Sequence, residues 1–364
     1  MGELKKGLEG VEVLETKISS IDGENGILKY RGIDINDLME FSFEAVTHLL
    51  LYEKLPDEDE LAAFSNQLRS SRKIDQDIID VLSTCSFNIQ AMDALRTAVS
   101  YMSHCDPDLA DNSLEANLRK ATGLIAKFPT VVAAFYRVRE DLDAIEPDSS
   151  MSHGANFLYM LKGKKPGELE AEIVDRDFVL SAEHELNAST FSARITASTL
   201  ADIHSTVISG LSTLKGRLHA GARMCVMEML DEISSPENAE DYVLNLISKK
   251  EKVMGFGHRV YKTHDPRDII YKKQARRLAD QGDPKWFKMA EIVEATVQRE
   301  LVEKRKKPIY PNLDFYSAVT YKYLEIPETL ATAMFAIGRV SGWIAHVLEQ
   351  YADNRLIRPR AKTS

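Results

Sequence analysis

The sequence predicts an all-α fold with a small β element near its N-terminus. Apolar residues recur at spacings of three and four along most of the 364-residue chain, which is the period of an amphipathic helix. Alternation typical of strands appears within residues 10–32, where the segments IDGENG and RG indicate turns. The chain is 44% hydrophobic and 28% charged, so it has enough apolar side chains for a dense core.

The helical segments can be placed in order along the chain. The first begins at Ser42, a good N-cap residue, and ends before Pro56. The apolar stretch 113–140 contains Pro129, which predicts either two helices or one kinked helix. Residues 177–214 are rich in Ala, Ser and Thr, so we expect helices there to pack closely in the centre of the fold. Further helices are predicted over residues 56–73, 76–87, 92–103, 223–234, 237–250, 266–281 and 284–305.

The last strong helix begins at Pro327, because proline is favoured in the first turn of a helix. Its predicted apolar face consists of Leu330, Met334, Ile337, Ser341, Ile344 and Leu348. Arg339 lies beside Gly338 on this largely apolar helix. Because a buried arginine without an anionic partner is costly, Arg339 indicates a site for a carboxylate.

Composition and charge argue against several classes of protein. The formal net charge is -10, so we expect no binding to nucleic acid. Cys85, Cys105 and Cys225 are few, scattered and odd in number, which argues against a disulfide framework and a thiolate metal site. Residues 1–15 lack the apolar core of a signal peptide, and no run of about 18 apolar residues indicates a membrane span. We therefore expect a cytoplasmic protein without a membrane partner.

Two basic segments contrast with this acidic background. Residues 249–277 contain ten Lys or Arg and three acids, and the stretch from Arg355 to Lys362 is also basic. A solvated charged face is the ordinary explanation of such a run. Arginine also suits carboxylates and phosphates, because its planar fork can donate two parallel hydrogen bonds. Both segments are therefore candidate sites for anionic ligands.

Three of the nine histidines lie in unusual surroundings. They are His184 in EHELNAST, His219 in KGRLHAGA and His258 in GFGHRVYK. Glycines beside His219 and His258 predict sharp turns that bring the main chain close to a ligand. Position 188 is Ala, so the segment beginning at His184 is not an HExxH zinc site. The GFG segment lacks the third glycine of a dinucleotide-binding fingerprint.

Six sequence blocks occur in an order that resembles the citrate synthase family. They are HELNASTFSAR, LHAGA, GFGHRVYK with the following DPR, YPNLDFYSA, AIGRVSGWIAHVLEQ and NRLIRPRA. The early segments GLEGV, IDGENGILKYRG and LLLYEKLP also fit, and the chain is most similar to the short bacterial and archaeal form. The resemblance implies a large helical domain, residues 1–219 and 321–364, and a smaller helical domain, residues 220–320, with a cleft between them.

The resemblance also implies a reaction, the condensation of acetyl-CoA with oxaloacetate and water to give citrate and CoA. Proton removal from the methyl group of a thioester needs a positioned base and a stabilised enolate oxygen. Asp314 matches the family's base, and burial among its apolar and aromatic neighbours would raise its pKa. His219 matches the histidine that hydrogen-bonds the thioester oxygen, so it should be neutral, with its tautomer fixed by a neighbour. His258 matches the histidine that polarises the oxaloacetate carbonyl and protonates the new alkoxide.

Oxaloacetate carries two carboxylates, so several arginines are needed to bind it. His184, Arg267 and Arg339 match oxaloacetate-binding residues of the family. Arg358 matches a further arginine that the family supplies from the neighbouring subunit. The resemblance therefore implies a homodimer whose active site is completed by Arg358 of the partner subunit.

Coenzyme A is the second anionic ligand that the resemblance implies. Gly255 and Gly257 would let backbone groups approach its adenine, and Arg259 and Lys262 are the candidates for its phosphates. Acetyl-CoA or propionyl-CoA is thus a co-substrate. We expect no metal and no permanently bound cofactor, because arginines and other protein donors can supply the charge stabilisation.

The chain departs from the family's pattern around His219. The usual segment is GPLHGGAN, whereas this chain has GRLHAGAR. Ala220 adds a methyl group where the backbone is expected to need a positive φ. Arg217 and Arg223 add two charges close to His219, which could retune the acyl site, bind an extra anion or weaken catalysis. A further departure is QAMD at 90–93, where many relatives have His-Pro-Met, and many relatives also continue beyond the C-terminal end of this chain.

Two alternatives stay open on the sequence alone. The enzyme could prefer propionyl-CoA and make 2-methylcitrate, because one methylene in a pocket is worth only about 1–3 kcal/mol. The chain could also be a citrate synthase-like binding or regulatory protein with little activity. The altered segment around His219 is the only support for that second alternative.

Overall fold

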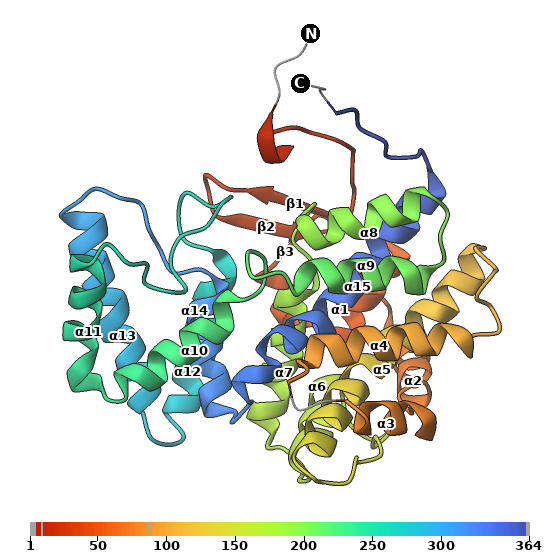
Figure 1. The fold of residues 1–364 in the computed structure, drawn as a ribbon, viewed down its shortest axis with the longest axis horizontal. Coiled ribbons are helices and arrows are strands. Elements are labelled where there is room, and N and C mark those ends of the chain that lie inside the picture. Colours follow the sequence, from red (N-terminus) through yellow and green to blue (C-terminus); the bar gives the residue numbers. More distant parts are fainter. Residues whose placement is uncertain (1–4, 9, 86–87, 362–364) are drawn as a thin grey trace.

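The computed structural model describes residues 5–8, 10–85 and 88–361, and it is mostly helical, as predicted (Figure 1). The end of the helix predicted over 76–87 lies outside the described residues, as does Lys362 of the C-terminal basic stretch.

The α-helices occupy most of the described chain. They are α1 (Phe43–Tyr52), α2 (Glu58–Ser70), α3 (Gln76–Ser83), α4 (Ala91–His104), α5 (Leu114–Arg139), α6 (His153–Lys162), α7 (Glu168–Ala182), α8 (Ala188–Ser198), α9 (Ile203–Leu214), α10 (Ala222–Ile233), α11 (Pro236–Ser248), α12 (Pro266–Ala279), α13 (Lys285–Val297), α14 (Leu313–Tyr323) and α15 (Ala331–Ala352). Short 3-10 turns occur at Lys6–Leu8, Asp37–Glu40 and Glu328–Leu330, and a π-helical turn, Gln298–Glu303, extends α13.

Helix α5 runs through Pro129 as one helix, so of the two predicted alternatives the single helix holds and the pair of helices does not. Proline removes one backbone hydrogen bond and crowds the preceding turn. The helix is nevertheless buried along most of its length, including Phe128, Pro129 and Val132. Tertiary packing of these residues outweighs the local penalty.

Three helical stretches were missed in the sequence: α6, the first part of α7, and α14. Helix α6 begins after Ser152, whose side chain accepts a hydrogen bond from the backbone N–H of Ala155. Gly154 lies in its first turn, where it weakens the local helical signal. Helix α7 begins at Glu168, earlier than the predicted start of that region at residue 177.

The predicted β element is a three-stranded antiparallel sheet. Its strands, in spatial order, are β1 (Ser19–Asp22), β2 (Ile27–Tyr30) and β3 (Ile33–Asp34). Ser19 pairs with Tyr30 and Asp22 pairs with Ile27, so the IDGENG segment forms the hairpin turn. The expectation of a small N-terminal β element is confirmed.

The sheet holds the turn between α7 and α8. The Tyr30 hydroxyl lies 2.9 Å from the carbonyl oxygen of Glu183, and Ser19 Oγ donates to Glu183 Oε1 at 3.0 Å. The backbone N–H of Glu185 donates to Ser19 Oγ at 3.0 Å. Glu185 has a φ of 51°, a conformation that needs such support in a residue with a side chain. The sheet therefore fixes the turn that carries His184.

Helix α15 is the central helix of the core, and it packs against α7, α8 and α5 among others. A Cβ atom on Gly342 would lie 2.1 Å from the Ala182 carbonyl oxygen, and one on Gly338 would lie 2.5 Å from that of Phe178. These glycines therefore allow α15 and α7 to approach closely. The stretch Glu328–Ala352 is long and apolar enough to cross a membrane, but 94% of its apolar window is buried inside the protein.

The helices fall into two groups in space. Helices α10–α14 lie together on one side of the molecule, and α1–α9 with α15 lie on the other (Figure 1). The sheet and both ends of the chain lie along one edge (Figure 1). The division into domains at residues 220 and 320 stays a prediction.

Candidate active site

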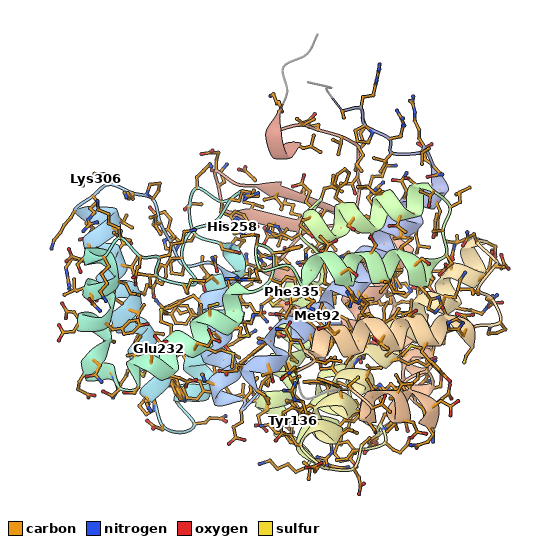
Figure 2. The ribbon with its side chains drawn as sticks, in the orientation of Figure 1. Met92, Tyr136, Glu232, His258, Lys306 and Phe335 are labelled. Carbon is orange, nitrogen blue, oxygen red and sulfur yellow. The ribbon has the colours of Figure 1, made fainter. Side chains whose placement is uncertain are left out.

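His184 and His258 lie side by side although they are far apart in the sequence. His184 is in the turn between α7 and α8, and His258 is in the loop between α11 and α12 (Figure 2). Their ring centroids are 5.4 Å apart. The Tyr261 ring lies 4.7 Å from that of His258, and its hydroxyl lies 3.2 Å from Nε2 of His184. Tyr261 was not singled out in the sequence, although it belongs to the block GFGHRVYK.

Backbone N–H groups fix the tautomer of His258. Those of Val260 and Tyr261 donate to its Nδ1 at 3.0 and 3.1 Å. Nδ1 must therefore carry a lone pair, and the neutral ring carries its proton on Nε2. Burial and the charge of Arg267 lower the pKa of His258 to about 4. At neutral pH the ring is thus an uncharged hydrogen-bond donor through Nε2.

The turn between β1 and β2 packs against the loop that carries His258. The Gly23 carbonyl oxygen accepts a hydrogen bond from the backbone N–H of Lys262 at 2.9 Å. A Cβ atom on Gly23 would lie 2.5 Å from the Val260 carbonyl oxygen, and one on Gly26 would lie 2.8 Å from that of His264. The absence of side chains at both glycines allows the hairpin to hold this loop in place.

Two buried arginines lie next to the histidines. Arg267 is 1% exposed and donates through Nε and Nη2 to Asp265 at 3.0 and 2.8 Å. Arg339 is also 1% exposed and donates through Nε to the carbonyl oxygen of Ser181 at 2.6 Å. Burial lowers the pKa of Arg339 to about 10, and the charge of Glu183 opposes this. Arg267 already has a bidentate carboxylate partner, so Arg339 would gain more from an incoming carboxylate.

His219 lies in the turn before α10, where Ser189 contacts its ring. The backbone N–H and Oγ of Ser189 lie 3.2 and 2.9 Å from Nε2. A backbone N–H can only donate, so Nε2 accepts and the neutral ring carries its proton on Nδ1. Burial and the charge of Arg339 lower the pKa of His219 to about 4. The expectation of a neutral histidine whose tautomer is fixed by a neighbour is confirmed.

Asp314 lies in the first turn of α14. Its backbone N–H donates to Oδ1 of the capping residue Asn312 at 3.0 Å, and its side chain is 16% exposed. Burial raises the pKa of Asp314, as predicted, while the charges of Arg223 and Arg267 oppose the rise. The carboxylate is therefore a partly desolvated base between two cations.

Two of the predicted ligands, Arg267 and Arg339, influence the pKa values of the other predicted residues. Among the predicted site residues, the charge of Arg267 lowers the pKa of His184 and His258 and opposes the rise in the pKa of Asp314. The charge of Arg339 lowers the pKa of His184 and His219. Both arginines act on His184, which connects the two sets of residues, and the His184 ring lies 5.4 Å from that of His258.

The other predicted cations lie on the surface. Arg259 and Lys262 are exposed in the loop that carries His258. Arg358 is exposed in the segment after α15, which is held at the end of α8 by a hydrogen bond from Ile357 N to Ser198 Oγ at 3.1 Å. Arg358 therefore does not share the enclosed surroundings of the buried arginines in its own chain.

Gly255 and Gly257 have positive φ angles of 80° and 87°, which confirms the predicted turns. A Cβ atom on Gly255 would lie 2.9 Å from Phe315 Cβ, so packing against α14 requires this glycine. At Gly257 the nearest contact would be Ile309, 3.9 Å away. Its N–H donates to the Tyr310 carbonyl oxygen at 2.8 Å.

A second basic run lies next to this glycine segment and was not singled out in the sequence. Residues 304–307 read KRKK, and they directly precede the stretch that pairs with Gly257. Lys306 lies at the outer end of the α11 and α13 side of the molecule (Figure 2). The sequence signal that could have found this run is its four consecutive cations.

The departures from the family pattern take different places in the structure. Ala220 does not have a positive φ, so the strain expected there is wrong. Arg217 is exposed, whereas Arg223 is buried beside Asp177 and Asp314. In the QAMD segment, the Lys215 ammonium donates to both carboxylate oxygens of Asp93, at 2.6 and 2.7 Å.

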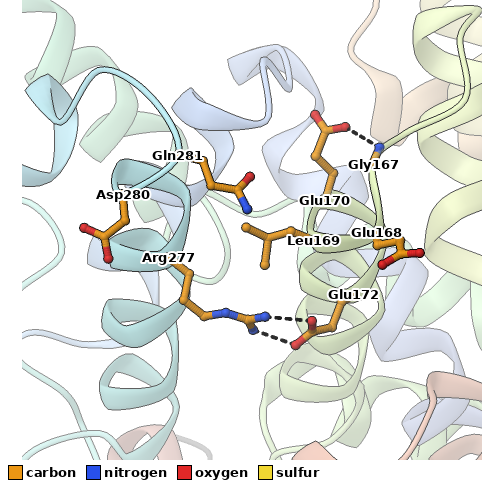
Figure 3. Close-up of a pocket in the computed structure, with 8 residues that line it drawn as sticks. All are labelled: Gly167, Glu168, Leu169, Glu170, Glu172, Arg277, Asp280 and Gln281. Carbon is orange, nitrogen blue, oxygen red and sulfur yellow. Dashed lines mark hydrogen bonds and ion pairs between the residues drawn. The ribbon is translucent and has the colours of Figure 1, made fainter.

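An open pocket of about 720 Å³ lies elsewhere, between the start of α7 and the end of α12 (Figure 3). It is lined by Gly167, Glu168, Leu169, Glu170, Glu172, Arg277, Asp280 and Gln281. Arg277 binds Glu172 with two hydrogen bonds of 2.6 and 2.8 Å. None of the site residues predicted from the sequence lines this pocket.

Comparison with known proteins identifies the family of the chain. The family model described as citrate synthase, C-terminal domain, matches residues 7–360. A citrate synthase of Haloferax volcanii is 47% identical, over 99% of this chain and 96% of its own length. A citrate/2-methylcitrate synthase of Bacillus subtilis is 40% identical, over 97% and 94% of the two chains.

A solved structure gives the same result. The citrate synthase of the archaeon Thermoplasma acidophilum, in a ternary complex with carboxymethyl coenzyme A and oxaloacetate, superposes with a TM-score of 0.92. It is 32% identical, and the match covers 99% of this chain and 96% of that one. Sequence and structure thus match over nearly the full length of both partners, and the chain belongs to the citrate synthase family.

Proposed function

We propose that this chain condenses acetyl-CoA with oxaloacetate and water to give citrate and CoA. The observation that carries the proposal is the presence of two neutral histidines, His219 and His258, whose tautomers are fixed by backbone N–H groups. Each therefore presents a defined N–H donor close to buried arginines. Membership of the citrate synthase family supports the same reaction.

In the first proposed step, Asp314 removes a proton from the methyl carbon of acetyl-CoA. Burial raises the pKa of Asp314, which makes it a stronger base than an exposed aspartate. The enolate oxygen that develops accepts a hydrogen bond from Nδ1–H of His219. An oriented donor in a desolvated site stabilises this charge without reorganisation.

In the second step, the enolate carbon attacks the keto carbon of oxaloacetate. His258 polarises the keto group through Nε2–H, and passes that proton to the oxygen that becomes the citrate hydroxyl. Water then attacks the thioester carbon, and the C–S bond breaks to release citrate and the thiol of CoA. The proton balance closes because three protons are available, one on Asp314 and two from the water. One protonates the departing CoA thiolate, one restores Nε2–H of His258, and one is released to solvent as the new carboxyl group ionises.

For oxaloacetate binding, we propose His184, Arg267 and Arg339 as ligands from this chain. Arg339 is the best-supported carboxylate ligand, because its hydrogen bond to the Ser181 carbonyl oxygen uses Nε, which leaves its terminal nitrogens for a carboxylate. The third arginine is Arg358 of the partner subunit, which makes a homodimer the active form. The exposure of Arg358 in this chain is compatible with that role.

For coenzyme A, we propose the loop that contains Gly255 and Gly257 as the adenine-binding segment. The space beside Gly257 supports this more strongly than the crowded surroundings of Gly255. Arg259 and Lys262 are proposed to bind phosphates, together with the basic run 304–307. The run 304–307 is included because it precedes Tyr310, whose carbonyl oxygen accepts a hydrogen bond from the backbone N–H of Gly257.

We propose that residues 220–320 form a smaller domain that closes on the larger one when oxaloacetate binds. Closure would exclude water before the thioester reacts. Small-angle scattering with and without oxaloacetate measures this directly. A smaller radius of gyration with oxaloacetate supports closure, and an unchanged radius contradicts it.

The proposed reaction is tested by release of thiol from acetyl-CoA in the presence of oxaloacetate. Asp314→Asn is expected to lower kcat by roughly 10²–10⁴-fold, the usual contribution of a general base. Asp241→Asn, an exposed carboxylate on α11, is the matched control and should leave kcat unchanged. Thiol release that survives Asp314→Asn would contradict the role of this residue.

A second substrate is favoured by the Bacillus subtilis relative, whose name includes 2-methylcitrate synthase. Comparing kcat/KM for acetyl-CoA and propionyl-CoA decides between the two acyl groups. A higher value with propionyl-CoA would make 2-methylcitrate the product. If neither substrate gives oxaloacetate-dependent thiol release above the Asp314→Asn background, a binding or regulatory protein is favoured instead. We propose a cytoplasmic location for either role.

A further inference from the structure

Arg223 is a buried arginine that lies between two carboxylates. It belongs to the first turn of α10 and is 2% exposed. Its Nη1 lies 3.3 Å from Asp177 Oδ1 on α7 and also hydrogen-bonds the Tyr321 hydroxyl. Its Nε lies 3.7 Å from Asp314 Oδ1 on α14. One guanidinium group therefore connects the proposed base to a second carboxylate on another helix.

Asp177 and three aromatic rings fix the orientation of this guanidinium. Asp177 is fully buried and also accepts hydrogen bonds from the hydroxyls of Tyr271 and Tyr321 at 2.6 and 2.8 Å. The guanidinium carbon lies 4.9 Å from the ring centroid of Tyr321 and 5.5 Å from that of Phe335. Because Asp177 is itself held by two tyrosine hydroxyls and the aromatic rings lie against the guanidinium group, Arg223 has few other positions available.

Two donors of Arg223 are left over. Within the described residues, Nε and Nη2 are buried and have no hydrogen-bond partner. Unpaired donors on a buried cation are costly, so their retention needs an explanation. The distance of 3.7 Å from Nε to Asp314 is slightly longer than a hydrogen bond. A small approach of α14 to α10 would convert this ion pair into a hydrogen bond.

We infer that Arg223 is a positioning residue for the proposed base, orienting the Asp314 carboxylate and keeping it ionised, while Asp177 holds Arg223 in place. The inference rests on the proposed function, because it assigns a task to a residue beside Asp314. Arg223 stands where the family usually has asparagine, and the inference assigns a role to this difference. That replacement adds one cation next to the base.

The charged and titratable groups that face Asp314 come from two helices and a cap. Arg223 and Cys225 lie on α10, Arg267 lies on α12, and Asp265 caps α12. The two arginines favour the carboxylate form of Asp314, whereas burial and Asp265 favour the protonated form. Without Arg223, only one of these two cations remains, so Asp314 should become protonated at a higher pH.

The test is the pH dependence of kcat/KM for acetyl-CoA, measured over about pH 5–9, where the acidic limb reports the free enzyme's base. Arg223→Asn is expected to move the acidic limb to higher pH. Arg223→Lys keeps the charge and should keep the limb near its wild-type position. Arg217→Asn removes an exposed arginine from the same segment and is the matched control, which should leave the limb unchanged.

Asp177→Asn should act in the opposite direction. It leaves Arg223 with Asp314 as its remaining carboxylate partner, so the limb should move to lower pH. The inference is overturned if Arg223→Asn leaves the limb in place, if Arg217→Asn or Arg223→Lys moves it equally, or if Asp177→Asn moves it upward. If Arg223→Asn does not fold by circular dichroism, the Lys and Asp177 variants decide. A wild-type protein that releases no thiol contradicts the proposed function instead.

Discussion

At the scale of single residues, Arg339 is a buried cation that, within the part of the chain that the structure describes, is held by a backbone carbonyl oxygen and not by a carboxylate. It is almost completely buried, and its Nε donates to a backbone carbonyl oxygen. Among anionic groups, Glu183 does most to oppose the fall in its pKa. The neighbouring cations Arg267 and Arg223 oppose its charge. Such a group is most stable when a ligand supplies a carboxylate.

Replacement of Arg339 by methionine should therefore weaken oxaloacetate binding selectively. Hydrogen bonds to charged groups contribute about 1.5–3 kcal/mol, so KM for oxaloacetate should rise roughly 10- to 150-fold. Methionine fills much of the same space without a charge, so the fold should survive. Steady-state kinetics measures KM for both substrates. An unchanged KM for oxaloacetate, or an equal rise for acetyl-CoA, would refute the assignment.

The sequence predicts the identity of the site residues better than their surroundings. His219, His258 and Asp314 are recognisable from short blocks, and the direction of the Asp314 pKa shift follows from its neighbours. The tautomer of His219 depends on Ser189, which lies on another helix, so it could not be predicted. The buried position of Arg223 was also unpredictable, because it depends on side chains from four other helices.

At the scale of elements, the contact between α7 and α15 positions both Arg339 and the turn that carries His184. Gly342 makes this contact possible, because a Cβ atom there would lie 2.1 Å from a backbone oxygen and 2.5 Å from Glu183 Oε2. A backbone oxygen cannot move away as a flexible side chain could. The two helices would have to separate.

Gly342→Ala is expected to lower the free energy of unfolding by about 1–3 kcal/mol, the usual cost of overpacking. The matched control is Gly123→Ala in α5, where a Cβ atom would meet nothing within 4 Å. That change should stabilise the protein by about 0.5–1 kcal/mol, because alanine favours a helix interior over glycine. Urea unfolding measures both. Equal effects of the two substitutions would disprove the close-packing argument.

Elements were predictable where the local pattern and the packing agree. The amphipathic helices α2, α3 and α4 correspond to predicted segments, and the hairpin follows from its turn residues. The sequence left two helices or one kinked helix open at Pro129, because burial against other helices decides between them. Helix α6 was missed because Gly154 weakens its helical pattern in the sequence, whereas packing buries most of the helix in the structure.

At the scale of the whole molecule, the enclosed histidines tie stability to pH. His219 and His258 have pKa values of about 4 in the folded protein, below the ordinary value of 6.5. Between these values the unfolded chain binds more protons than the folded one. The stability that the two histidines contribute is therefore complete above about pH 6.5, and it is lost as the pH falls towards 4.

The free energy of unfolding should thus decrease as the pH is lowered from about 6.5 to about 4, by up to about 3 kcal/mol for each histidine. Carboxylates also titrate in this range, so the comparison must be made between variants. His258→Gln should flatten the slope in urea unfolding, whereas His104→Gln, at an exposed site, should not. Identical slopes in the two variants would show that His258 is not buried as a neutral group.

A crystal structure with oxaloacetate and carboxymethyl-CoA measures directly whether the proposed site residues converge on the two substrates. Convergence of the site predicts that the keto oxygen lies within about 3 Å of His258 Nε2, with a carboxylate on Arg339 and the carboxymethyl group between His219 and Asp314. The opposite result would be oxaloacetate bound away from these residues, for example in the pocket beside Arg277, with His219 and Asp314 on separate surfaces.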